Sequence, residues 1–231
     1  MRKVAIFDID GTIFRSSLLI QIVERLIEED IFKKTTAQEF ARQKLAWLDR
    51  KGDYEAYIMA VVKVFMANIK GVSYADFNRI GEEVVAEQKD RVYRFTRGLI
   101  KEYKKKGYFL LAISHSPKGV LDHFCKRLGF NKVYGLFYET GPSERFTGKV
   151  AEEAFIFNKA SVLKHTVSKE WLTLKGSVGV GDTESDIPFL ELVENPICFN
   201  PNAKLYAHAR RNGWRVVVER KDVVYEIESS R

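Results

Sequence analysis

The sequence predicts an α/β protein with a doubly wound, mostly parallel sheet and a helical domain inserted after the first strand. Three observations lead to this prediction. Short apolar runs without alternation recur along the chain and indicate strands buried on both faces. Amphipathic helical patterns separate most of these runs, as in a sheet wound with helices. The stretch from about residue 16 to residue 92 breaks the alternation and is helical throughout.

The first predicted strand is Val4–Phe7, which ends directly before Asp8. The same apolar character returns later in the chain, at Tyr108–Ile113, Ser177–Val180, Pro196–Phe199, Trp214–Val218 and, more weakly, Val133–Phe137. Residues 138–150 contain Gly141-Pro142 and Gly148, which indicate a loop or a short hairpin. The mixed, polar tail from Lys221 to Arg231 is expected to fray.

The predicted helices have recognisable ends. Ser116 can cap a helix that Pro117 opens and Gly129 ends. Gly107 ends a helix before the second strand, and Asn212-Gly213 ends one before the strand at Trp214. From these elements we expect a catalytic core built from residues 1–14 and 95–231. Residues 15–94 are expected to form a helical cap.

Composition narrows the class of protein. Of the 231 residues 45% are apolar, which is enough for a sizeable core, and the net charge is +7 without a long basic block. We therefore do not expect nucleic acid as a partner. The apolar stretches are too short for a signal peptide or a membrane span. Cys125 and Cys198 lie in apolar patterns and are predicted to be free thiols in a reducing cytoplasm. The sequence gives no indication of the oligomeric state.

Two carboxylates follow the first predicted strand, where the chain reads Asp8-Ile9-Asp10-Gly11-Thr12. In an open parallel sheet, ligands bind beyond the carboxyl ends of the strands. Two carboxylates so close together are costly unless a cation holds them, and Gly11 lets the chain turn. Oxygen ligands alone suit a hard cation such as Mg²⁺.

A second acidic group, Gly181-Asp182-Thr183-Glu184-Ser185-Asp186, follows the predicted strand Ser177–Val180. Either group alone is also typical of a solvated turn, because Asp and Gly are common in turns. If the two strands are neighbours, Asp8, Asp10 and Asp182 can share one ion. Both groups together, each after a buried strand, favour a magnesium site.

These two groups resemble the first and fourth motifs of the haloacid dehalogenase superfamily, which are Asp-x-Asp-Gly-Thr and Gly-Asp-x-x-x-Asp, each after a strand. The order of elements is similar over nearly the whole chain. Ser114 resembles the second motif, a Ser or Thr that ends the next core strand. Lys159 fits the third motif, a helical lysine, better than Lys149 or Lys164. The helical insert is similar to the phosphoserine-phosphatase-like branch and its subfamily IB hydrolases, and implies a Rossmannoid core with a cap.

The resemblance implies a chemical role for four side chains. Asp8 would attack phosphorus and form an aspartyl-phosphate. Asp10 would act as the general acid for the leaving oxygen and then as the base that activates water. Ser114 would donate a hydrogen bond to the phosphate, and Lys159 would place a positive charge against it.

The resemblance also implies a Mg²⁺ site. Asp8 and Asp182 would bind the ion directly, together with the main-chain carbonyl of Asp10. Asp186 would orient Asp182, a bound water or Lys159 rather than contact the metal. The ion would neutralise the phosphoryl oxygens, so that an anionic nucleophile can approach an anionic substrate.

Two departures from the family pattern concern the substrate. Phosphoserine phosphatases carry a Glu soon after the first motif, where this chain has Ser17, and glycines after the second-motif serine, where it has His115 and Ser116. Both argue against phosphoserine, since its ammonium group would lack a carboxylate partner. His115 and Arg15 are candidate substrate contacts. A half-buried histidine at a helix start and a solvated arginine are the simpler interpretations.

Residues of the predicted cap are weaker candidates for substrate binding. Three aromatic residues can line a pocket, although their helical spacing is more simply a core stripe: Trp47, Tyr54 and Tyr57. Three others are candidates by charge alone: Arg42, Lys44 and Lys63.

We therefore predict a magnesium-dependent phosphatase that hydrolyses a small phosphorylated metabolite under a closing cap. A phosphotransferase would use the same residues with an alcohol as acceptor. A catalytically silent binding protein on this scaffold is a second alternative. A phosphatase of RNA or protein is a third, which a large cap would hinder and the positive charge would favour.

Overall fold

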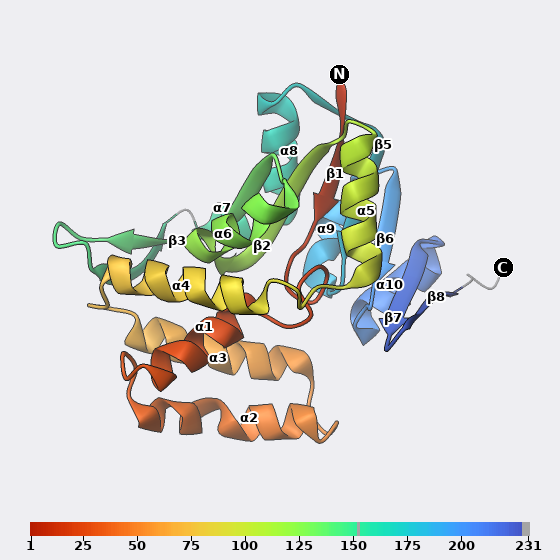
Figure 1. Cartoon of the computed structure of the whole chain (residues 1–231). Helices are drawn as coiled ribbons and strands as arrows, with labels where there is room; N and C mark the ends of the chain where they lie inside the picture. Colours follow the sequence, from red (N-terminus) through yellow and green to blue (C-terminus); the bar gives the residue numbers. More distant parts are fainter. Residues whose placement is uncertain (152, 228–231) are drawn as a thin grey trace.

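The computed structural model describes residues 1–151 and 153–227. Its centre is an eight-stranded sheet in the order β4-β3-β2-β1-β5-β6-β7-β8 (Figure 1). The strands are β1 Arg2–Phe7, β2 Phe109–Pro117, β3 Lys132–Thr140, β4 Phe146–Ala151, β5 Leu172–Gly181, β6 Asn195–Phe199, β7 Arg215–Arg220 and β8 Val223–Ile227. Only the outermost pairs, β3–β4 and β7–β8, are antiparallel among the described strands. The predicted mostly parallel sheet is confirmed.

Strand β1 lies in the middle of the sheet, between β2 and β5. Ile6 stands opposite Leu111 on β2 and opposite Gly179 on β5. The residues from Val4 to Phe7 are fully buried, because helices cover both faces of the sheet at this point. This register places the carboxyl ends of β1 and β5 side by side, and the amide of Asp8 donates to the Val180 carbonyl over 3.0 Å.

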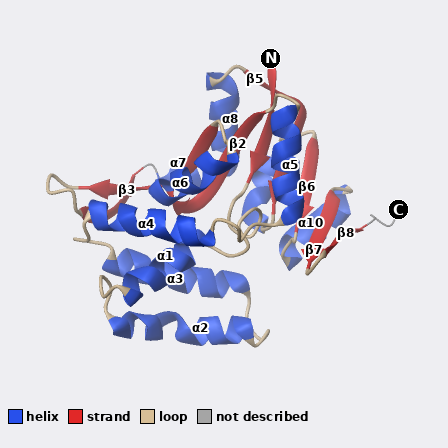
Figure 2. Ribbon diagram, viewed as in Figure 1, coloured by secondary structure: helices blue, strands red, loops and turns tan. Residues whose placement is uncertain are grey.

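Helices cover both faces of the sheet (Figure 2). The helices on the core are α5 Arg94–Lys105, α6 Lys118–Leu128, α7 Glu153–Phe157, α8 Lys159–Lys169, the short 3₁₀ turn Glu184–Asp186, α9 Ile187–Leu190 and α10 Ala203–Asn212. The crossovers run in opposite directions from β1, so right-handed connections put α5 and α6 on one face and the later helices on the other. As predicted, α6 ends at Gly129 and α10 at Gly213.

The region that breaks the strand–helix alternation forms a separate group of helices at one end of the sheet (Figure 1). It contains α1 Leu18–Glu28, the 3₁₀ turn Lys34–Ala37, α2 Gln38–Leu48, α3 Tyr54–Asn68 and α4 Tyr74–Gln88. The β3–β4 hairpin binds this group through main-chain hydrogen bonds, from Gly71 to the Phe146 carbonyl over 2.8 Å and from Phe146 to the Val72 carbonyl over 3.0 Å. The cap boundaries at residues 15 and 94 stay a prediction.

Two local predictions are corrected. Ser116 does not cap α6, because β2 continues through Pro117 and the helix begins at Lys118. The tail does not fray from Lys221: residues 223–227 form β8, in which Val224 lies opposite Glu219 on β7 and adds a strand to the sheet. The remaining residues of the predicted tail, 228–231, lie outside the described residues. Cys125 and Cys198 are buried free thiols, as predicted.

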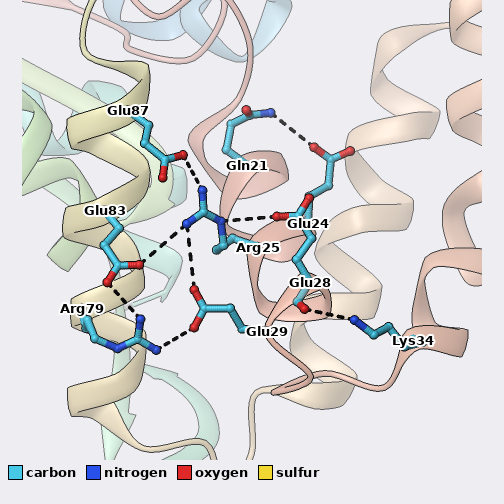
Figure 3. Close-up of polar contacts among 9 residues, drawn as sticks. All are labelled: Gln21, Glu24, Arg25, Glu28, Glu29, Lys34, Arg79, Glu83 and Glu87. Carbon is cyan, nitrogen blue, oxygen red and sulfur yellow. Dashed lines mark hydrogen bonds and ion pairs between the residues drawn. The ribbon is translucent and has the colours of Figure 1, made fainter.

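An ion-pair network joins α1 to α4 (Figure 3). Arg25 on α1 contacts Glu28 and Glu29 at the end of its own helix, and Glu83 and Glu87 of α4. A second arginine, Arg79 on α4, pairs with Glu29 over 2.7 Å and with Glu83 over 3.0 Å. The side chain of Arg25 is only 21% exposed, so its loss would leave several carboxylates close together without a cation.

We expect Arg25→Met to lower the free energy of unfolding by about 1–2 kcal/mol at pH 7 and low salt. The loss should disappear below about pH 4, where protonated glutamates no longer repel each other. Chemical denaturation at both pH values measures the effect. Lys34→Met is the control, because Lys34 is 63% exposed, forms an ion pair with Asp30 over 3.2 Å and donates to the main-chain carbonyl of Glu28 over 3.0 Å. Equal effects of the two changes would contradict this role for Arg25.

Candidate active site

The first acidic motif forms a tight turn at the carboxyl end of β1. Gly11 has φ +80°, and a Cβ atom at this position would lie 2.1 Å from Oδ2 of Asp182. A side chain here would therefore collide with the second acidic motif. The Thr12 hydroxyl donates to Oδ1 of Asp182 over 3.1 Å. Glycine at position 11 thus lets the two acidic loops approach each other closely.

Lys159 links the acidic residues of the site. It is the first residue of α8, and its Nζ lies 2.7 Å from Oδ1 of Asp8 and 2.5 Å from Oδ1 of Asp186. All three side chains are almost fully buried, with residue exposures of 2%, 5% and 0% for Lys159, Asp8 and Asp186. The two sequence alternatives for this lysine, Lys149 and Lys164, are both exposed. The structure therefore brings Lys159 to Asp8.

Asp186 organises the loop that follows β5. Its Oδ2 accepts hydrogen bonds from the amides of Asp182 over 2.9 Å and Thr183 over 3.1 Å. Its other oxygen contacts Lys159. Because both oxygens already have donors, Asp186 orients Lys159 and the backbone of Asp182. That Asp186 supports the site without binding the metal stays a prediction.

Burial shifts the ionisation of these groups. It raises the pKa of Asp8 from 3.8 to about 7; Lys159 opposes this shift, and the carboxylates of Asp186 and Asp10 add to it. Burial and the charges of Asp8 and Asp186 raise the pKa of Asp182 well above its ordinary value. Burial disfavours the ammonium of Lys159, but Asp186 and Asp8 outweigh it and raise the pKa of this lysine.

The residues present fit a divalent cation. Ligand atoms of Asp8, Asp182 and Asp186 all lie within 4.8 Å of one another. Lys159 is the cation that contacts two of these three carboxylates, so the group carries an excess of negative charge in a buried place. Such an excess is costly unless a cation balances it. The ligands are all oxygen atoms, which suits a hard metal ion.

Asp10 faces away from this group and towards β2 and α1. Its Oδ2 accepts hydrogen bonds from Ser114 over 2.7 Å and Ser116 over 2.8 Å. Its Oδ1 accepts from the Leu18 amide, at the N-terminus of α1, over 2.6 Å. Ser114 thus lies beside the first motif, together with Ser116, which the sequence did not predict as a site residue. The two-residue spacing of the serines could have indicated this, since residues 114 and 116 lie on the same face if the strand continues.

The two predicted substrate contacts lie at the margins of the site. His115 packs its ring 4.7 Å from that of Phe157, and its buried Nε2 has no hydrogen-bond partner among the described residues. Burial lowers the pKa of His115 to about 4, so the ring is neutral at neutral pH. Arg15 is exposed and lies over the ring of Tyr93 at 5.7 Å. A role for either residue in substrate binding stays a prediction.

Of the cap candidates, Tyr54 lies nearest the acidic residues. Burial, and then the charges of Asp10 and Asp182, raise the pKa of its phenol, which lies close to Ser17. Trp47 packs against the Tyr54 ring at 5.2 Å. Lys44 is paired instead with Glu24 over 2.6 Å, and Arg42 and Lys63 are exposed.

None of the helices that the structure describes has the length and apolar character needed to cross a membrane.

Comparison with known proteins agrees with this geometry. The model of the haloacid dehalogenase-like hydrolase family matches residues 5–191. The phosphoserine phosphatase SerB1 of Mycobacterium tuberculosis is 27% identical over 216 residues, which are 92% of this chain and 69% of that protein. A histidinol-phosphatase of Neisseria meningitidis is 24% identical over 225 residues, 94% of this chain and 99% of that protein.

A solved structure described as a phospho-aspartyl intermediate analogue of phosphoserine phosphatase has a similar fold. The TM-score is 0.62 at 20% identity, and the match covers 96% of this chain and 95% of that one. Because the family model spans most of the chain, the protein belongs to the haloacid dehalogenase-like hydrolases. It is an enzyme of this hydrolase family, and its fold is similar to that of phosphoserine phosphatase. The family predicted from the two acidic motifs is confirmed.

The excess of buried negative charge leads to a stability prediction. With a chelator present at pH 8, the free energy of unfolding of Asp182→Asn should be about 1–3 kcal/mol higher than that of the wild type. The variant should therefore unfold at a higher temperature. A carboxyl group whose pKa is raised on folding lowers the free energy of unfolding as pH rises from its unfolded-state pKa to its folded-state pKa, and the full loss remains at higher pH. The difference in the free energy of unfolding between the variant and the wild type should therefore be smaller at pH 5. Thermal unfolding at both pH values measures it, and a less stable variant at pH 8 would refute the prediction.

Proposed function

We propose that the protein is a Mg²⁺-dependent phosphatase that hydrolyses a small phosphomonoester through an aspartyl-phosphate on Asp8. The observation that carries this proposal is the buried contact between Asp8 and Lys159, beside the second carboxylate Asp10. A carboxylate held by a lysine at the carboxyl end of a central strand is suited to be a nucleophile towards a phosphate ester. The phosphatase names of the relatives support the same reaction class.

Asp8 would attack phosphorus in line. Lys159 contacts its Oδ1 and leaves Oδ2 without a protein donor among the described residues, so we assign the attack to Oδ2. The bond from phosphorus to the alcohol oxygen then breaks as the new bond to Asp8 forms. Lys159 would also balance negative charge on the phosphoryl oxygens. The Ser114 hydroxyl, which donates to Asp10 in this structure, would turn to one of these oxygens when substrate binds.

Asp10 would carry the proton in both halves of the reaction. It would first protonate the leaving alcohol oxygen and then remove a proton from the water that hydrolyses the aspartyl-phosphate. Three donors fix its carboxyl group, the hydroxyls of Ser114 and Ser116 and the amide of Leu18. A fixed orientation favours proton transfer at one position. This suits a group that gives a proton to the leaving oxygen and then takes one from the water that replaces it.

Asp8 and Asp182 would hold the magnesium ion, together with the main-chain carbonyl of Asp10. When bound, the ion supplies positive charge that neutralises the phosphoryl group and the surrounding carboxylates. Asp10 and Asp182 are partly exposed, whereas Asp8 and Lys159 are buried. Substrate would therefore enter from the side of Asp10 and Asp182, under the helices of residues 15–94, which we propose as a cap that opens and closes.

The first test is phosphate release from an aryl phosphate and from a panel of phosphorylated metabolites. Turnover should require magnesium, stop on chelation, and fall about 1,000-fold or more in Asp8→Asn, because the amide is not a nucleophile. Asp90→Asn is the matched control, since Asp90 is exposed, and it should retain full activity. Turnover that survives in folded Asp8→Asn would refute the covalent mechanism.

Ser116 provides a second test, because its hydroxyl donates to Asp10, while its main-chain amide, which donates to the Ser114 hydroxyl, is kept in an alanine variant. Ser116→Ala should lower kcat about tenfold with little change in KM, since the lost hydrogen bond goes to a charged group. Ser168→Ala, on the exposed side of α8, is the control. A kcat equal to that of the control would show that Ser116 does not position Asp10.

A further inference from the structure

The N-terminus of α3 reaches the acidic residues of the core. Tyr54, the first residue of this helix, packs its ring against Trp47 and Tyr57 at centroid distances of 5.2 Å and 6.3 Å. Its phenol lies close to Ser17, which is only 2% exposed. The packing fixes the ring, so the hydroxyl group points to a defined place.

This place is next to the proposed general acid and base. Ser17 directly precedes Leu18, whose amide donates to Oδ1 of Asp10 over 2.6 Å. Burial, and then the charges of Asp10 and Asp182, raise the pKa of Tyr54. The phenol therefore keeps its proton and remains a neutral hydrogen-bond donor beside the carboxylates.

A second contact holds the same end of α3 over the site. Nζ of Lys204 on α10 lies 3.4 Å from Glu55 and 2.5 Å from Glu184, which belongs to the second acidic motif. The Asn202 amide donates to the carbonyl of Asp182 over 2.8 Å. The ion pairs are exposed and weak individually, but they connect the residue after Tyr54 to the loop that carries Asp182.

We propose that Tyr54, together with Ser17, binds the alcohol part of the substrate, and that this part is uncharged and carries a hydroxyl group. The inference rests on the proposed phosphatase function and names the substrate class of the same site. Both recognition groups are neutral hydroxyls, which pair with another hydroxyl as donor or acceptor.

The neighbouring charges disfavour a charged alcohol part. A carboxylate at this place would lie beside Asp10 and Asp182 and be repelled. An ammonium would need a carboxylate of its own, whereas the oxygens of Asp10 already accept hydrogen bonds from Leu18, Ser114 and Ser116.

Four phosphate esters of equal chain length test this proposal: ethyl, 2-hydroxyethyl, 2-aminoethyl and carboxymethyl phosphate. For the wild type, kcat/KM should be highest for 2-hydroxyethyl phosphate, by about tenfold over each charged ester. Tyr54→Phe keeps the ring and removes only the hydroxyl. It should lower kcat/KM for 2-hydroxyethyl phosphate about tenfold and leave ethyl phosphate within about twofold.

Tyr57→Phe is the matched control, because Tyr57 lies one turn further along α3 and the charge that acts on its phenol is that of Glu24. It should not change the ratio between the two esters. A Tyr54→Phe enzyme that loses both esters equally would assign Tyr54 a purely structural role and overturn the inference. A wild type that prefers the amino or carboxy ester would also overturn it. A wild type that turns over none of these esters and no aryl phosphate would refute the proposed function itself.

Discussion

The site depends on one buried ammonium group. Lys159 contacts Asp8 at the end of β1 and Asp186 in the loop after β5, so a single side chain joins α8 to two neighbouring strands. Without this cation the buried carboxylates would repel one another at a place that excludes water. With it, the group still carries an excess of negative charge, which a divalent cation can balance. This excess of buried negative charge lowers the stability of the folded protein, while it provides the proposed metal site.

The parallel sheet brings the side chains of the candidate site close together. Parallel pairing puts the carboxyl ends of β1, β2 and β5 at one edge, so the Asp8, Ser114 and Asp182 side chains lie on adjoining strands or just beyond them. Gly11 removes the side chain that would separate the two acidic loops. Helices α1 and α3 complete the arrangement from outside the sheet. The main-chain amide of Leu18, at the start of α1, holds Asp10, and Lys204 links the start of α3 to the loop that carries Asp182.

Two sequence patterns were ambiguous for physical reasons. Ser116-Pro117 has the chemistry of a helix start, yet the same residues continue β2, because pairing with β3 extends to Pro117 opposite Leu136. The polar residues after Lys221 look like a tail, yet pairing with β7 makes them a strand. In both places the hydrogen bonds that decide the structure come from a distant segment, which local propensity does not contain.

The sequence by itself determined the sheet, its insertion and the two acidic motifs. Each motif directly follows a strand buried on both faces, and parallel strands bring their carboxyl ends to one edge. The sequence also favoured Lys159 over Lys149 and Lys164, and the tertiary structure brings it to Asp8. Only tertiary structure decided which aromatic residue of the insert faces the acidic loops, since Tyr54 and Tyr57 lie on one helical stripe. Helical spacing describes a face, whereas the neighbour of that face is set by packing between segments far apart in the chain.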